Sequence, residues 1–265
     1  MNIDTSDYYP APLLPEDGSE FPDRTENPEN FESPEISDKS DKSDGSDGSD
    51  RSNRSDRSDR SENKIITAIA NVLSWVLVPV LMPVYGIILM FGLTILSFTG
   101  FGTRLAFTAI AFGFNVAIPA VVIIIMKRMG MIKDVGLNNR EERFVPYLIC
   151  IFCLIGTALF MGYKGAPKWM EMFFIGGAVA GIVEVVINRW WKISVHAAGI
   201  AGIVAMLLHI MIYDYTRPEA LTWLLITIGC SGLLGASRIW LGRHSLGQVL
   251  AGYAVGFCAV YFVML

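Results

Sequence analysis

The sequence predicts an all-α fold, a polytopic bundle of about six to seven transmembrane helices preceded by a disordered N-terminal tail. Two observations predict it. The 265-residue chain is 52% hydrophobic and 17% charged, with a mean hydropathy of +0.45, which is too apolar for an ordinary soluble domain. The charge is also unevenly divided, since residues 1–64 carry a net −10 and residues 65–265 a net +6. These features disfavour a soluble enzyme, a DNA-binding domain and a secreted disulfide scaffold.

The tail is a low-complexity segment. Residues 38–62 repeat Ser and Asp with Lys, Arg and Gly about every third residue. Without apolar residues to bury, such a segment cannot offset the entropy lost on ordering. We therefore expect two parts, a disordered tail at 1–64 and a transmembrane domain at 65–265.

A helix needs about 20 apolar residues to cross about 30 Å of hydrocarbon, and seven apolar runs follow the tail. They cover residues 70–97, 105–126, 144–163, 169–188, 194–213, 219–236 and 245–265. Pro79 and Pro83 predict a kink or an interfacial portion in the first run, and the sixth run is short and glycine-rich. Small residues at helix-packing spacing predict close contacts: Gly177 and Gly181, Ala198 and Gly202, Gly252 and Gly256.

Three polar clusters separate these runs: Lys127–Arg143, Asn188–His196 and Ser237–Gln248. Two crossings separate each cluster from the next. An even number of crossings returns the chain to the same side, so we expect all three clusters at one membrane surface.

The residue types in the clusters suit phosphate chemistry. His196 and His244 are two of only three histidines, and histidine commonly transfers protons near neutral pH. Ser194 stands at a predicted N-cap, where free backbone N–H groups favour an anion. His244 and Gln248 share a helix face, so Gln248 can fix the ring tautomer. Cations that can grip phosphate oxygens surround them: Lys133, Arg140, Arg143, Lys192, Arg238 and Arg243.

Other interpretations of the polar residues remain open. Basic residues are common at the ends of membrane helices because of positive-inside bias and snorkelling. His209 lies inside an apolar run and is interpreted as a packed, hydrogen-bonded residue. Glu184, about one turn from the end of its run, fits a functional role or a structural hydrogen bond. No Asp/Glu/His cluster suggests a two-metal site, so we expect no metal and no cofactor.

The third cluster resembles a motif of the type 2 phosphatidic acid phosphatase family, the membrane relatives of the vanadium haloperoxidases. The family blocks read Lys-x6-Arg-Pro, Pro-Ser-Gly-His and Ser-Arg-x5-His-x3-Asp. The third block is matched in spacing by Ser237, Arg238 and His244, with Gln248 in place of the Asp.

The first two blocks are matched in part. Ser194 and His196 keep the second block's spacing, although Val and Ile replace its Gly and Pro. Lys133 and Arg140 keep the spacing of the first block, although Glu follows where Pro is expected. Arg143, with Pro three residues later, is a competing alignment.

The resemblance implies a role for each matched residue. His244 would attack phosphorus and form a phosphohistidine, and His196 would protonate the leaving group. Gln248 would orient His244 without stabilising its charged form, which implies a slower enzyme than one with Asp. The phosphate oxygens would be held by Lys133, Arg140 or Arg143, Ser194 and Arg238.

Three functions remain open at this point. The first is a metal-independent phosphatase acting on a lipid phosphate or an isoprenyl diphosphate. The second is a non-catalytic relative that binds anionic lipid headgroups, which Gln248 and the incomplete blocks favour. The third, a small transporter or channel, would need more intramembrane charge. The expected partners are the bilayer and a lipid phosphate, with no nucleic acid, and the oligomeric state is left open.

The side of the membrane is also left open. The clusters hold nine Lys and Arg against four in the opposite loops, which predicts a cytoplasmic site and tail in an integral protein of the cell or inner membrane. Relatives of the resembled family usually work on the external or lumenal face. The headgroup and the choice of mono- or diphosphate are not specified.

Overall fold

The computed structural model describes residues 63–132, 142, 144–213 and 217–265. All of them belong to one compact unit of the chain. The predicted tail, apart from its last two residues, lies outside the described ranges. So do three predicted phosphate-binding residues, Lys133, Arg140 and Arg143.

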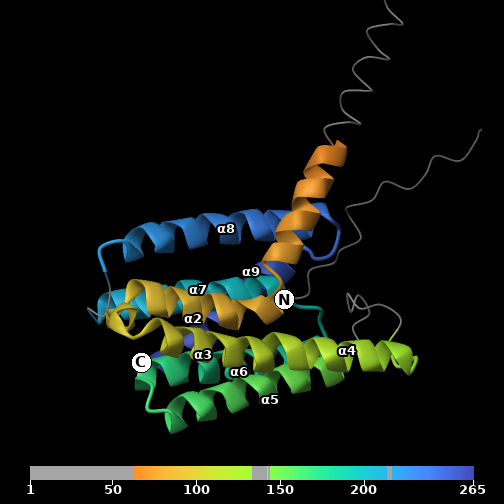
Figure 1. Cartoon of the computed structure of the whole chain (residues 1–265). Coiled ribbons are helices and arrows are strands. Elements are labelled where there is room, and N and C mark those ends of the chain that lie inside the picture. Colours follow the sequence, from red (N-terminus) through yellow and green to blue (C-terminus); the bar gives the residue numbers. More distant parts are fainter. Residues whose placement is uncertain (1–62, 133–141, 143, 214–216) are drawn as a thin grey trace, which may run out of the picture. The chain divides into compact units, whose positions relative to one another are not determined.

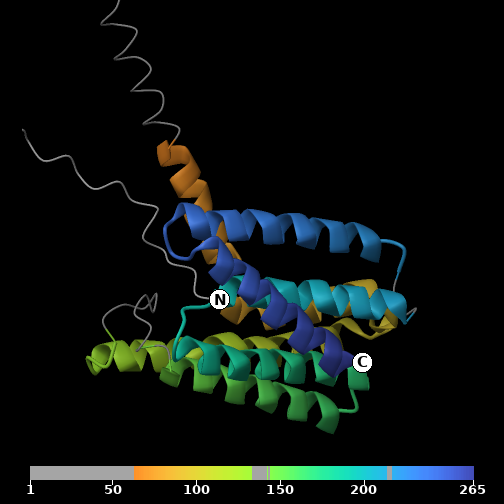
Figure 2. The same cartoon turned by 180° about the vertical axis from the view of Figure 1, so that it is seen from behind.

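Within the described ranges, seven helical stretches are long and apolar enough to cross a membrane, which confirms the predicted polytopic bundle of an integral membrane protein (Figures 1 and 2). Their bounds fall close to the predicted runs. They are Asn63–Leu93, Phe101–Arg128, Phe144–Tyr163, Lys168–Asn188, Val195–Ile212, Ala220–Trp240 and Leu246–Met264.

The first stretch is broken where the prolines predicted a kink. Helix 63–76 ends before Pro79, and the chain continues as η1 (Pro79–Leu81) and α2 (Met82–Leu93). Proline has no N–H to donate to the preceding turn, and Figure 1 shows helix 63–76 inclined to α2. The stretch starts before the predicted residue 70 because polar residues still extend the helix, as when the Thr67 hydroxyl donates to the Asn63 carbonyl (2.7 Å).

The second stretch contains a π-turn. It consists of α3 (Phe101–Phe112), η3 (Gly113–Ala117) and α4 (Ile118–Arg128). Buried Asn115 in this turn donates from Nδ2 to the Ala111 carbonyl (2.9 Å) and to Thr157 Oγ1 (2.8 Å) on α5 (Phe144–Tyr163). This polar contact ties the second span to the third, and the hydropathy pattern did not predict it.

The remaining spans form one packed series. They are α6 (Lys168–Asn188), α7 (Val195–Ile212), α8 (Ala220–Trp240) and α9 (Leu246–Met264). α8 packs on α7, α7 on α9, α9 on α6, and α6 on α5. The sixth span extends to Trp240, beyond the predicted end at residue 236, and the Ser237 hydroxyl is satisfied within the helix by donating to the Leu233 carbonyl (2.7 Å).

Glycines bring α7 and α9 into backbone contact. A Cβ on Gly252 would overlap the carbonyl oxygen of Ser194, and a Cβ on Gly256 would overlap that of Ala198. The two contacts advance by four residues on both helices, so α7 and α9 run parallel. Their N-terminal ends therefore lie at the same end of the bundle.

The other predicted small-residue contact is also confirmed. A Cβ on Gly177 would contact Leu154 at 3.6 Å, and one on Gly181 would contact Ile151 at 2.9 Å, so both glycines face α5. In lipid there is no hydrophobic driving force between helices. Close packing through small residues therefore holds them together.

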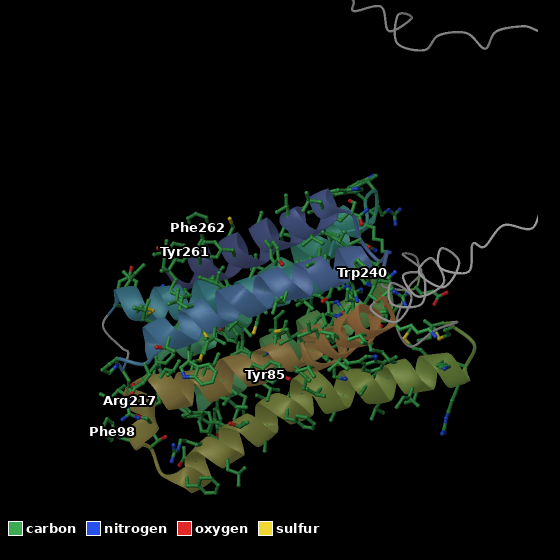
Figure 3. All side chains as sticks on the ribbon, turned by 90° about the horizontal axis from the view of Figure 1, so that it is seen from above. Tyr85, Phe98, Arg217, Trp240, Tyr261 and Phe262 are labelled. Atoms are coloured by element: carbon green, nitrogen blue, oxygen red, sulfur yellow. The ribbon has the colours of Figure 1, made fainter. Side chains whose placement is uncertain are left out.

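The bundle has two distinct ends. Figure 3 shows Trp240 at one end, and Phe98 and Arg217 at the other. At the Arg217 end, the Arg217 N–H donates to the Leu93 carbonyl at 2.7 Å, which joins the loop before α8 to the end of α2. We call the opposite end, where α8 stops and α7 and α9 start, the Trp240 end. The second and third polar clusters meet there, as the count of crossings predicted.

Candidate active site

A tight turn between α8 and α9 positions His244. Gly242 has φ of +63°, a conformation that glycine adopts without strain. The Gly242 N–H donates to the Ile239 carbonyl (2.9 Å), and the Arg243 N–H donates to the Arg238 carbonyl (3.0 Å). This is the Schellman pattern that ends a helix. The His244 N–H also reaches the Arg238 carbonyl (3.3 Å), so the histidine backbone is fixed against the last turn of α8.

A capping box then starts α9. Ser245 is the N-cap, and its Oγ accepts from the Gln248 N–H (3.4 Å). In return, Gln248 Oε1 accepts from the Ser245 N–H (3.2 Å). Reciprocal bonds of this kind satisfy two donors that a helix start leaves without partners. The segment from Ser237 to Gln248 therefore contains the end of α8, then His244, then the start of α9.

The same amide oxygen fixes the tautomer of His244. Gln248 Oε1 lies 3.2 Å from His244 Nδ1. Because Oε1 already accepts from a backbone N–H, it is the acceptor in the second bond as well, and Nδ1 carries a proton. In the neutral ring the lone pair is then on Nε2. The His244 side chain is buried, with 7% exposure, and Gln248 is half-buried.

Backbone contact joins the second cluster to the third. The Ser194 N–H donates to the Gln248 carbonyl at 3.2 Å. Ser194 is the N-cap of α7, as predicted, and its Oγ accepts from the Ala197 N–H (3.4 Å). The first turn of α7, which carries half-buried His196, therefore lies against the first turn of α9.

The structure gives Ser194 a structural task besides the predicted phosphate contact. The residue is fully buried, its hydroxyl caps α7, and its carbonyl accepts from the Ala198 N–H (3.1 Å). The capping bond leaves the hydroxyl proton available for donation, and the phosphate contact stays a prediction.

Cations and a tryptophan lie in the same two segments as the two histidines. Arg238 is half-buried on the last turn of α8, Lys192 is half-buried just before α7, and Arg243 is exposed beside His244. The Trp191 ring faces Gly247, where an added Cβ would lie 3.8 Å from the ring. Sequence reasoning did not assign Trp191, although a glycine in the first turn of a helix was a signal for close packing at that point.

The third histidine lies away from this site. His209 is in the last turn of α7, about 20 Å along the axis from His196. It is 4% exposed and packs against Tyr213 with ring centroids 4.6 Å apart. The expected packing is confirmed, while Nδ1 has no hydrogen-bond partner in the described part of the chain.

Two buried polar residues lie near the Trp240 end of α6. Glu184 and Asn188 are 4% and 8% exposed, one turn apart at the Trp240 end of that helix.

As far as the described residues go, no three His, Cys, Asp or Glu side chains are grouped closely enough to hold a metal ion.

One of the comparisons with known proteins finds a match. Residues 184–265 match the family model described as the PAP2 superfamily. The matched region includes the second and third blocks and leaves out the first block, Lys133 to Arg140. No curated protein and no solved structure matches the chain. Residues 184–265, which carry both histidines of the candidate site, are therefore similar to the PAP2 superfamily.

Proposed function

We propose that the protein is a metal-independent membrane phosphatase that hydrolyses a lipid phosphate or an isoprenyl diphosphate through a phosphohistidine intermediate. One observation carries the proposal. Gln248 binds both His244, through its side chain, and the N-cap of the helix that bears His196, through its carbonyl. Two histidines on adjacent helix starts, in the region that matches a phosphatase family, supply a nucleophile and a proton donor.

In the first step, His244 Nε2 attacks phosphorus in line with the leaving oxygen. A P–N bond forms as the P–O bond breaks, and protonated His196 gives its proton to the leaving oxygen. The hydrogen bond from Nδ1 to Gln248 keeps the Nε2 lone pair directed away from Gln248. A ring held in this tautomer needs no rotation or proton exchange before attack.

In the second step, His196 takes a proton from a water molecule that attacks the phosphohistidine. The P–N bond breaks, inorganic phosphate leaves, and both histidines return to their starting protonation states. Arg238 and the predicted cations Lys133 and Arg140 (or Arg143) stabilise the equatorial oxygens, since phosphoryl transfer depends mainly on positioning and charge stabilisation.

The location of the site suits a lipid substrate. Trp190, Trp191 and Trp240 are exposed around the Trp240 end, and tryptophan concentrates where bilayer meets water. A phosphate headgroup at that depth reaches His244 while its hydrocarbon remains among the helices.

The test is release of inorganic phosphate from phosphatidic acid and from an isoprenyl diphosphate by purified protein. We expect activity that EDTA does not change. His244→Gln should lower it by at least about 10³-fold, because the nucleophile is lost, and His196→Gln by about 10²–10⁴-fold. His209→Gln is the matched control, a buried histidine at the other end of α7, and should retain activity.

Phosphate release that persists in His244→Gln, or that EDTA abolishes, would contradict the proposal. The alternative is a non-catalytic relative that binds anionic lipid headgroups, which the replacement of the family Asp by Gln248 favours. It predicts no turnover by wild type and weaker binding of phosphatidic acid vesicles by Arg238→Ala.

A further inference from the structure

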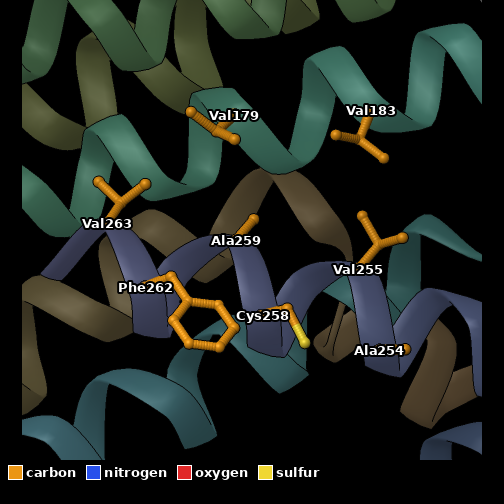
Figure 4. Close-up of a pocket in the computed structure, with 8 residues that line it drawn as sticks. All are labelled: Val179, Val183, Ala254, Val255, Cys258, Ala259, Phe262 and Val263. Atoms are coloured by element: carbon orange, nitrogen blue, oxygen red, sulfur yellow. The ribbon is translucent and has the colours of Figure 1, made fainter. Parts of the chain in front are cut away.

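An apolar groove runs along the outside of the bundle between α6 and α9 (Figure 4). Val179 and Val183 line it from α6, and Ala254, Val255, Cys258 and Ala259 line it from α9. No residue that lines it is charged, and its volume is about 470 Å³. It is an open groove and not an enclosed cavity.

The groove has a cause in the sequence. α6 and α9 approach closely at Gly176, where an added Cβ would lie 2.7 Å from the Cα of Val260. Toward the Trp240 end of this crossing, the facing residues are valines and alanines. Such short side chains leave part of the space between the two helices unfilled.

The groove lies in line with the candidate site along the axis of α9. Val255 is seven residues after Gln248, so it lies on the same face of α9 and about 10 Å farther along the axis. Phe262, which lines the far part of the groove, continues this face about 21 Å from Gln248. On α6, Val183 is about 7.5 Å from Asn188 at the Trp240 end.

We propose that this groove holds the hydrocarbon chain of the lipid phosphate whose headgroup is bound at His244. The inference rests on the proposed function and extends it to the substrate class. Other lipid-facing surfaces of the bundle also contact hydrocarbon, but this groove follows the helix face that begins at Gln248. A substrate anchored by its phosphate therefore extends along it.

The length of the groove indicates a preference for long chains. One leaflet provides about 15 Å of hydrocarbon, half the thickness of the bilayer core. The groove reaches about 21 Å below Gln248, so a long isoprenyl chain contacts all of it and a short acyl chain only its upper part.

The first test fills the groove. Ala254→Trp and Cys258→Trp place a large ring at exposed positions on its wall. For a long-chain isoprenyl phosphate we expect KM to rise about threefold to tenfold. The effect is modest because the chain moves from lipid and loses only packing contacts. Hydrolysis of dioctanoyl phosphatidic acid should change less than about twofold. Leu233→Trp, on the exposed face of α8, is the control.

The second test does not depend on turnover. An isoprenyl phosphate with a diazirine near the end of its chain is photolysed with the His244→Gln variant in vesicles. We expect labelled peptides from residues 254–263 and 179–183, and loss of label in Cys258→Trp. Label spread equally over α8 would overturn the proposal, as would an unchanged KM in both groove variants.

The two tests also separate this inference from the proposed function. If the wild type releases no phosphate from any lipid, the proposed function is wrong. The labelling pattern still tests whether the groove binds the hydrocarbon chain. If a groove variant loses activity toward long and short substrates alike, the protein has been perturbed generally. Labelling of residues 254–263 in the histidine variant then supports the groove, and labelling elsewhere overturns it.

Discussion

Gln248 performs two tasks at the residue scale, and the structure allows them to be separated. Its Oε1 accepts from the Ser245 N–H, which stabilises the start of α9, and from His244 Nδ1, which sets the tautomer. An amide orients the ring but cannot stabilise an imidazolium as a carboxylate does. The residue therefore limits the proposed chemistry without preventing it.

We predict that Gln248→Asp raises kcat by about tenfold or more, because a carboxylate stabilises the charged histidine. Gln248→Leu should lower kcat by a similar factor and cost about 1 kcal/mol of stability through the lost cap. Ser245→Ala is the control, since it weakens the cap and keeps the bond to His244. Steady-state kinetics and thermal unfolding in detergent measure both effects. Equal losses of kcat in Gln248→Leu and Ser245→Ala would show that Gln248 acts only through the helix start.

The local structure around His244 could be predicted from the sequence. A glycine after a helix, followed by Ser-x-x-Gln, specifies a helix stop and a helix start through bonds within a few residues. The tautomer followed from the four-residue spacing of His244 and Gln248. The contact of Ser194 with Gln248 joins residues 54 positions apart, and no local pattern specifies it.

At the scale of elements, the contact between α7 and α9 brings the two histidine-bearing segments together. It depends on the absence of side chains at Gly252 and Gly256, which face backbone atoms of Ser194 and Ala198. Backbone cannot shift as a flexible side chain can. A larger residue at either position must therefore separate the helices.

We predict that Gly256→Leu costs about 3 kcal/mol or more of stability, because overpacking against backbone has no local relief, and that it abolishes activity. Gly229→Leu is the matched control, since Gly229 on α8 is exposed and an added Cβ meets nothing within 4 Å. Thermal unfolding and limited proteolysis in detergent measure the difference. Comparable stability of the two variants would contradict the parallel α7–α9 contact.

At the scale of the whole molecule, the topology places the start of the first span beside the site. Six crossings separate Lys64 from Arg243, an even number. The Trp240 Nε1–H donates to Thr67 Oγ1 at 3.2 Å, which places the start of the first span at the Trp240 end.

We predict that single cysteines at Lys64 and Arg243 react with a membrane-impermeant thiol reagent from one side, and that a cysteine at Lys164 reacts only from the other. All three residues are exposed. Intact cells compared with inverted vesicles give the absolute orientation, for which the positive-inside count favours a cytoplasmic tail and site. Labelling of Lys64 and Arg243 from opposite sides would disprove the seven-span order.

The sequence by itself determined that the chain crosses the membrane about six to seven times, the break near Pro79 and the common side of the last two polar clusters. These depend on local hydropathy, proline chemistry and the parity of crossings. Only the tertiary structure decided which helices touch, where Trp191 packs and where the groove between α6 and α9 lies. The reason is physical: in lipid every helix face is apolar, so hydrophobicity does not select a neighbour. The neighbour is selected by the shape of the helix surface, at glycines that contact residues far away in the sequence.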